Sequence, residues 1–219
     1  MGPLIKKELI VQKKMLLFGL GYAVFLFFVF ANPVFQEFTY SMAAFGIAYI
    51  TVIGVAQAEY KNNSDIVINS LPVTRREVVA AKYLSIITFT VIALALVGVV
   101  GLLFHFLLPV LHYRLINLSD VFTTAVSVIL LAAVSLPIYF KTSAQWARVV
   151  NVVVFLVLFF APAQLVGYMQ NGQEPWVRNV AGLAGNQYWL LTLTGLAILM
   201  IVVLISYFIS LRIYLNKDF

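Results

Sequence analysis

The chain has 219 residues, of which 63% are hydrophobic and 10% are charged, and its mean hydropathy is +1.02. Soluble domains are about 45–50% apolar and about 25% charged, and a soluble fold of this size lacks enough polar side chains to cover so much apolar surface. The composition therefore excludes a soluble globule, a disordered chain or a nucleic-acid module as the main body and indicates an integral membrane protein. In such a protein, the net charge of +6 points to cytoplasmic loops rather than to nucleic acid.

The first segment, residues 1–14, mixes apolar residues with four lysines and one glutamate. This pattern predicts an amphipathic helix on the inner leaflet, with its lysines near anionic headgroups. A plain positively charged anchor for the first span is the alternative interpretation.

Six apolar runs follow, each close to the 20 residues or so that a membrane-spanning helix needs. They cover residues 15–31, 40–58, 83–108, 121–140, 149–169 and 188–211. No domain boundary or linker is visible between them. We therefore expect an all-α membrane protein with six transmembrane helices, forming a single transmembrane domain over residues 1–219.

The distribution of basic residues predicts the orientation of these helices. With a cytoplasmic N-terminus, twelve of the 14 lysines and arginines lie in inside segments, and only Arg114 and Arg178 lie outside. The opposite orientation violates the positive-inside rule. We therefore expect both termini in the cytoplasm.

The segment between the second and third runs, residues 59–82, is the longest predicted cytoplasmic loop. Asn63 or Ser64 can cap a short helix, with Asp65 favourable at its positive end, and Pro72 ends that helix. Its apolar side consists of Ile66, Val67, Ile68 and Leu71. Such a side predicts either contact with lipid headgroups or docking into a partner protein; an ordered connector is the remaining possibility.

Directly after this short helix, the sequence from Thr74 to Glu77 fits the S/T-x-x-E capping box. A capping box marks the start of a helix, so we expect a new helix here that continues into the third span.

The sequence contains none of the motifs for phosphate binding, zinc proteolysis or serine hydrolysis (G-x-x-x-x-G-K-[ST], H-E-x-x-H and G-x-S-x-G). Cysteine is absent, and two histidines are too few for a metal cluster, so we predict no catalytic, cofactor or metal site in this chain. The predicted spans also contain no carboxylate, which argues against a proton-coupled carrier. Their polar residues, which either line a pathway or join helices by hydrogen bonds, are Gln57, His105, Asn151 and Gln164.

Three features around the 59–82 segment occur together in a known family. Glu59 closes the second run, SLPVTRRE follows at residues 70–77, and the pair Lys82-Tyr83 opens the third run. In these features the sequence resembles the membrane subunit of type-2 ABC exporters, and most closely the small six-span permeases that accompany export of peptide antibiotics and peptide toxins.

The resemblance implies an ATP-driven exporter in the plasma membrane of a bacterium, in which this chain is not itself an enzyme. Two permease chains, identical or different, pair with each other and with two copies of an ABC ATPase, which bind ATP and Mg²⁺. The cargo is amphipathic or apolar, with peptides favoured. The 59–82 loop then carries the coupling helix, and its predicted ATPase-coupling residues are Glu59, Asp65, Ile66, Val67, Ile68, Leu71, Pro72, Arg75 and Arg76.

The residues alone leave other functions open. A stand-alone secondary carrier or channel needs charged or broken helices near the midplane, and only Pro137 and Pro162 indicate such breaks. A non-transporting membrane anchor or immunity protein is equally compatible with the composition.

Overall fold

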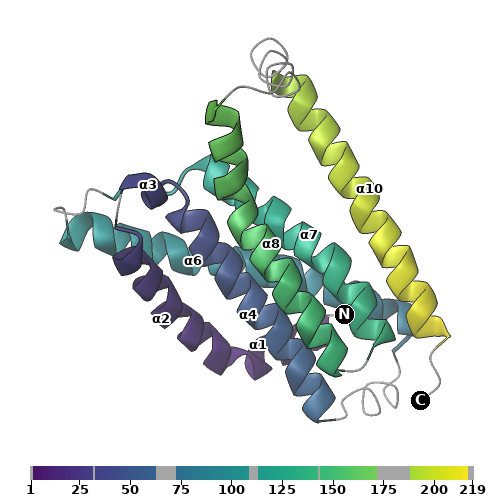
Figure 1. The fold of residues 1–219 in the computed structure, drawn as a ribbon. Coiled ribbons are helices and arrows are strands. Elements are labelled where there is room, and N and C mark those ends of the chain that lie inside the picture. Colours follow the sequence, from purple (N-terminus) through teal and green to yellow (C-terminus); the bar gives the residue numbers. More distant parts are fainter. Residues whose placement is uncertain are drawn as a thin grey trace.

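The computed structural model describes residues 2–31, 33–62, 73–108, 113–142, 144–171 and 188–216, and within these ranges all regular secondary structure is helical. The helices, in chain order, are α1 (Gly2–Val11), α2 (Lys13–Val29), α3 (Pro33–Gln36), α4 (Thr39–Lys61), α6 (Arg75–Leu107), α7 (Leu118–Lys141), α8 (Ala144–Asn171) and α10 (Tyr188–Leu215) (Figure 1). Each of the six long helices from α2 to α10 coincides with one of the predicted apolar runs.

Four of these helices are long and apolar enough to cross a membrane in the parts that the structure describes: Thr39–Glu59, Arg75–Leu107, Leu118–Lys141 and Leu193–Leu215. The N-terminal helices Leu4–Val11 and Lys13–Val29 meet at an angle of 55°, and they make a fifth candidate span if the bent pair is counted as one. In α8 the apolar helical stretch, Trp146–Phe160, is shorter than the four candidate spans. These findings confirm an all-helical, multi-pass membrane protein.

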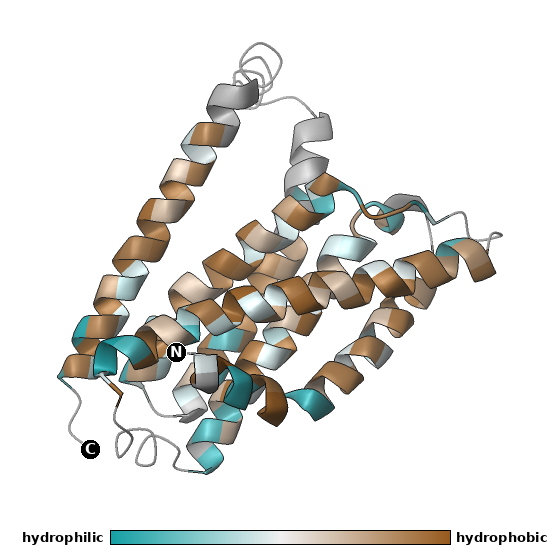
Figure 2. Cartoon of the chain, turned by 180° about the vertical axis from the view of Figure 1, so that it is seen from behind, coloured by the Kyte–Doolittle hydropathy of each residue, from teal (hydrophilic) through white to brown (hydrophobic). Residues whose placement is uncertain are grey.

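The bundle is organised around α4, which contacts α2, α6, α7 and α8, whereas α10 packs on α7 and α6 (Figure 1). The buried core between these helices includes Phe27, Tyr40, Val97 and Leu131. Hydrophobic residues also cover the outside of the helices, and hydrophilic residues gather near their ends (Figure 2). Apolar side chains on the outside as well as in the core are the arrangement that lipid requires.

Two glycines allow large side chains of neighbouring helices to approach closely. A Cβ atom at Gly101 of α6 would collide with the hydroxyl and ring of Tyr40, and one at Gly46 of α4 would collide with the ring of Tyr22. Small residues at such contacts let membrane helices pack closely where no hydrophobic effect drives their association.

The predicted capping box at the start of α6 is confirmed. The hydroxyl of Thr74 accepts a hydrogen bond from the backbone N–H of Glu77 (3.3 Å), and the Glu77 carboxylate accepts one from the backbone N–H of Thr74 (2.8 Å). This mutual bonding satisfies two backbone donors that would otherwise lack partners. As a result, α6 begins at Arg75, about two turns before the start of the predicted span at residue 83.

The prediction that the spanning helices contain no carboxylate is wrong, because the helices extend further than hydropathy indicates. The candidate spans include Glu59 of α4, Asp120 of α7 and, in the capping box of α6, Glu77. Glu59 and Asp120 are buried and paired with basic side chains. A paired charge costs far less to bury than an isolated one, so it does not end the helix.

The short helix predicted between α4 and α6 cannot be compared with the structure. The residues that define it, namely Asp65, Ile66, Val67, Ile68, Leu71 and Pro72, lie outside the described residues. The predicted N-terminal helix is present as α1.

Candidate functional site: an ion cluster at one end of the bundle

Four basic and acidic side chains and a tyrosine meet where α4 ends and α6 begins, which we call the loop end of the bundle. Glu59 of α4 accepts hydrogen bonds from Lys82 (2.5 Å) and Tyr139 (2.6 Å) on one carboxylate oxygen and from Lys7 (3.0 Å) on the other. Lys82 also pairs with Glu8 of α1 at 2.7 Å. These five residues form the ion cluster, and they join α1, α4, α6 and α7.

The ion cluster is largely withdrawn from solvent. Glu8, Glu59 and Lys82 are all at least 92% buried, whereas the side chain of Lys7 is 37% exposed. The two ammonium groups balance the two carboxylates, and Lys82 alone contacts both of them. Removal of Lys82 would therefore leave uncompensated carboxylate charge in a low-dielectric environment.

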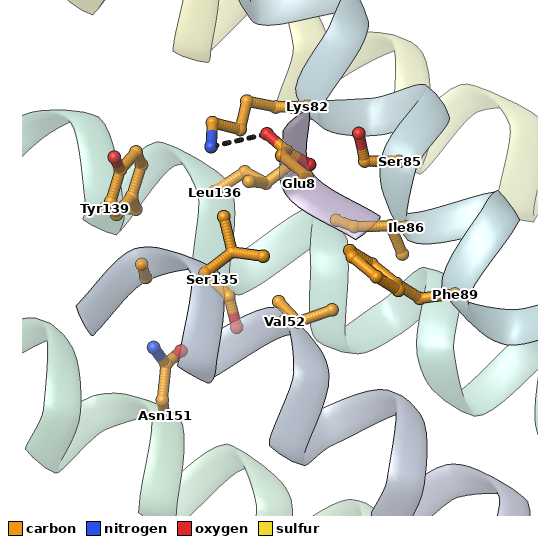
Figure 3. Close-up of a pocket in the computed structure, with 12 residues that line it drawn as sticks. Glu8, Val52, Lys82, Ser85, Ile86, Phe89, Ser135, Leu136, Tyr139 and Asn151 are labelled. Atoms are coloured by element: carbon orange, nitrogen blue, oxygen red, sulfur yellow. Dashed lines mark ion pairs between the residues drawn. The ribbon is translucent and has the colours of Figure 1, made fainter. Parts of the chain in front are cut away.

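A small cavity lies directly against the ion cluster. Its volume is about 30 Å³. Figure 3 shows the Lys82–Glu8 ion pair on one side of this cavity and Asn151 of α8 on the other. Five helices (α1, α4, α6, α7 and α8) thus contribute to one polar region.

The first turns of α6 also hold the end of α10. The Arg75 guanidinium donates hydrogen bonds to the carbonyl oxygens of Leu215 (2.7 Å) and Tyr214 (3.3 Å), where the negative end of the helix dipole attracts a cation. Farther along α6, the Tyr83 hydroxyl lies 2.7 Å from that of Ser206 on α10. The start of α6 is consequently bonded to α10 through Arg75 and to α1 and α4 through Lys82, and it lines the cavity together with α7 and α8.

A second polar contact fixes the opposite end of the bundle. Arg114 makes a bidentate ion pair with Asp120 (2.6 and 2.7 Å) and donates to the carbonyl oxygen of Glu37 (2.6 Å). Hydrogen bonding to Asp120 raises the pKa of the Arg114 guanidinium above its ordinary value, so this group stays charged. Sequence reasoning missed this contact, although N-x-x-D at residues 117–120 is a capping-box signal.

The structure places the three described coupling candidates differently. Glu59 lies inside the bundle, within the ion cluster. Arg75 bonds to the end of α10, and Arg76 is exposed at the same end. These residues share the loop end, but only Arg76 presents its side chain mainly to the outside.

The four polar residues predicted as pathway candidates do not come together. Gln57, His105 and Gln164 are exposed, and the His105 ring bonds to the Tyr113 carbonyl oxygen at 2.6 Å. Asn151 is buried and lines the cavity beside the ion cluster, which none of the other three does.

Sequence reasoning did not single out most of the ion cluster. The sequence marks Lys82 only as part of the Lys82-Tyr83 pair, and it does not single out Lys7, Glu8 or Tyr139 as site residues. A usable signal existed for Lys82, because a lysine inside a long apolar helix needs an acidic partner. No sequence signal identifies Tyr139.

The ion cluster is suited to holding helices together. The described residues include no group of three or more histidine, cysteine, aspartate or glutamate side chains placed to bind a metal ion. Its groups can transmit a displacement of one helix to three others, since the ion pairs join α1, α4 and α6 and the Tyr139–Glu59 hydrogen bond adds α7.

Comparison with known proteins is consistent with this architecture. No curated protein and no solved structure matches the sequence significantly. The sequence profile described as "ABC-2 family transporter protein" matches residues 3–215, which is nearly the whole chain. The chain therefore belongs to the ABC-2 transporter family, whose members are the membrane subunits of ABC transporters.

Proposed function

We propose that this chain is the permease subunit of an ATP-driven exporter whose separate ABC ATPase docks at the loop end. Family membership makes an ATPase partner the source of energy. The observation that supports this docking site is that three features follow one another at the start of α6. They are the capping box, the Arg75 contact with α10, and Lys82 of the ion cluster. Any force applied to the segment before Thr74 reaches four other helices within three turns.

In this proposal, residues 63–72 form the coupling helix, whose apolar side inserts into the ATPase. Ile66, Val67, Ile68 and Leu71 supply that side, Asp65 and Pro72 set its ends, and Arg76 contacts the rim. Glu59 and Arg75 act from within the permease: Glu59 connects the end of α4 to Lys82, and Arg75 connects α6 to α10. The coupling segment is thus flanked on both sides by residues that bond to other helices of the bundle.

The proposed permease has six spans, with α1 on the inner leaflet and both termini in the cytoplasm of a bacterial cell. Lysine and arginine residues concentrated at the loop end support this orientation. Ile10 and Val11 of α1 are exposed, and they are suited to contact with lipid. Two such chains, identical or different, pair in the membrane with two ATPase subunits, which carry the ATP and Mg²⁺.

The proposed cargo is an amphipathic or apolar peptide that enters from the inner leaflet. The outer surfaces of α2, α8 and α10 expose large apolar side chains along most of their described length. The charged residues of the ion cluster are paired with one another, and all of them except Lys7 are buried, so they are not free to bind a charged cargo.

Co-purification with the ATPase tests the docking site. Aspartates at Ile66 and Ile68 (Ile66→Asp with Ile68→Asp) should abolish both ATPase binding and substrate-stimulated ATP hydrolysis, because a charge in an apolar interface is costly. Asn62→Asp, an exposed change of similar charge just before the segment, should preserve both. If the double variant binds and stimulates the ATPase normally, the docking site lies elsewhere.

A further inference from the structure

The cavity beside the ion cluster has a mixed lining, with polar groups from four helices and apolar groups from α4, α6 and α7. The polar residues are Glu8, Lys82, Ser85, Ser135, Tyr139 and Asn151. Val52 and Val55 of α4 form part of the apolar wall. A cavity lined only by hydrocarbon stays dry, whereas one with several converging polar groups can hold water.

Two of these polar groups are buried without hydrogen-bond partners among the described residues. They are the Ser135 hydroxyl oxygen and the Asn151 amide oxygen, Oδ1. Ser135 is 4% exposed and Asn151 is 5% exposed, and Figure 3 shows the Asn151 amide pointing into the space that the lining residues surround. Buried polar groups in proteins are nearly always satisfied, because leaving one unpaired is energetically costly.

The charges around the cavity determine what kind of ligand fits. Lys82 and Glu8 face it as an ion pair, and Glu59 and Lys7 balance each other behind them. The net charge of the ion cluster is therefore zero, which favours neither a cation nor an anion. A neutral molecule that both donates and accepts hydrogen bonds matches the carbonyl-type oxygen of Asn151 and the hydroxyl of Ser135.

We propose that this cavity is a hydration site, which holds one or two water molecules that bond to Asn151 and Ser135 beside the Lys82–Glu8 ion pair. Its volume of about 30 Å³ leaves room for at least one water molecule. The site is too small for a peptide cargo.

With this hydration site, α8 is connected to the ion cluster in a different way from α1, α4, α6 and α7. Direct ion pairs or hydrogen bonds join the ion cluster to α1, α4, α6 and α7, while water connects it to Asn151 of α8. Water-mediated bonds are nearly as favourable as direct ones and re-form after small displacements. α8 can therefore shift against the ion cluster without separating a buried ion pair.

X-ray hydroxyl-radical footprinting of the purified full chain in H₂¹⁸O tests the site directly, because radiolysis of trapped water oxidises adjacent side chains. Leu136 lines the cavity, and Leu26 is equally buried, at 5% exposure, but lies elsewhere. We expect ¹⁸O incorporation at Leu136 to be at least threefold faster than at Leu26. Equal rates at the two leucines would overturn the proposal.

Substitutions give a second test through the sign of the shift in unfolding temperature. Asn151→Leu and Ser135→Ala should lower the unfolding temperature and reduce labelling of Leu136 to the rate of Leu26, because each removes a partner of the water. Thr124→Val is the matched control, since the Thr124 hydroxyl is also buried without a described partner but does not line the cavity. Its removal should leave the unfolding temperature unchanged or raised.

If the two cavity variants leave the unfolding temperature unchanged or raise it, as expected for the control, the polar atoms are unsatisfied rather than hydrated, and the proposal is wrong. If a variant does not fold, the comparison of Leu136 with Leu26 in the unmodified chain decides the question alone.

Discussion

Lys82 is the residue on which the ion cluster depends, because its ammonium group contacts both Glu8 and Glu59 inside the bundle. Its methylene chain spans part of the bundle core, and its charge keeps two buried carboxylates compensated. Lys7 reaches only Glu59 and is 37% exposed. The two lysines therefore contribute very differently, although the sequence gives both the same charge.

We predict that Lys82→Met lowers the free energy of unfolding by about 3–5 kcal/mol, the cost of leaving buried carboxylates without their partner. Lys7→Met, which removes the same charge at a more exposed position, should cost about 0–1 kcal/mol. Thermal or denaturant unfolding of the purified chain in detergent measures both. Equal losses in the two variants would show that burial does not determine the strength of these pairs.

At this scale the sequence identified only part of the ion cluster. Glu59 and Lys82 could be found because they belong to a recognisable motif at the ends of two apolar runs. Glu8 could not, because α1 turns its glutamate toward the bundle and leaves Ile10 exposed. That rotation depends on the contact between α1 and α6, which no local pattern encodes.

Among the helices, α6 is the element that connects the loop to the rest of the bundle. It begins at a capping box, bonds to α10 through Arg75, and carries Lys82 into the ion cluster. A well-defined helix start is required if a displacement of the preceding segment is to reach the membrane helices.

Loss of the cap should loosen this start without unfolding the bundle. In Thr74→Ala we expect the backbone amides of residues 75–78 to exchange hydrogen several-fold faster, in line with a cap worth about 1 kcal/mol. Thr88→Ala, which removes an exposed hydroxyl bonded only within α6, should leave exchange at residues 75–78 unchanged. Hydrogen–deuterium exchange with mass spectrometry distinguishes the two, and an unchanged rate in Thr74→Ala would contradict the role of the cap.

Close packing between α6 and α4 gives a second prediction at this scale. Gly101→Ala should lower the free energy of unfolding by about 1–3 kcal/mol, because the new methyl group overlaps the Tyr40 side chain. Gly98→Ala, one turn earlier on the same helix, meets open space and should be neutral or stabilising by up to about 1 kcal/mol. If both variants behave alike in an unfolding titration, the Gly101–Tyr40 contact does not constrain the packing.

The sequence predicted the long helices well and their ends poorly. Hydropathy located all six long helices, because apolar runs of this length have few other uses. It placed the starts of α6 and α7 too late, since Arg75, Glu77 and Asp120 are charged residues that capping boxes draw into the first turn. Capping signals were the better guide to these boundaries.

For the whole molecule, the sequence predicted the alternation of helix direction but not which helices touch. The central position of α4 and the packing of α10 on α7 and α6 arise from side-chain contacts between segments far apart in the chain. The contact of Tyr83 on α6 with Ser206 on α10 is one example. Such contacts depend on how the helices pack in three dimensions. Because one hydrophobic run resembles another in sequence, the sequence does not indicate which runs are neighbours.

Orientation in the membrane can be measured cleanly because the chain contains no cysteine. We predict that Asn62→Cys, at the loop end, reacts with a membrane-impermeant maleimide only after the cells are opened. Ser119→Cys, at the opposite end beside the exposed start of α7, should react in intact cells. The reverse pattern would contradict the proposed cytoplasmic position of the ion cluster.

The central claim is that this permease moves cargo only when a nucleotide-hydrolysing partner acts on its loop end. Transport in proteoliposomes tests this most directly: the chain is reconstituted with and without its ATPase, and export of a fluorescent amphipathic peptide is followed with ATP or ADP. The account predicts transport only with both the ATPase and ATP, and its loss in the Ile66→Asp with Ile68→Asp variant. Equal peptide transport by the chain alone, without ATPase or ATP, would contradict it.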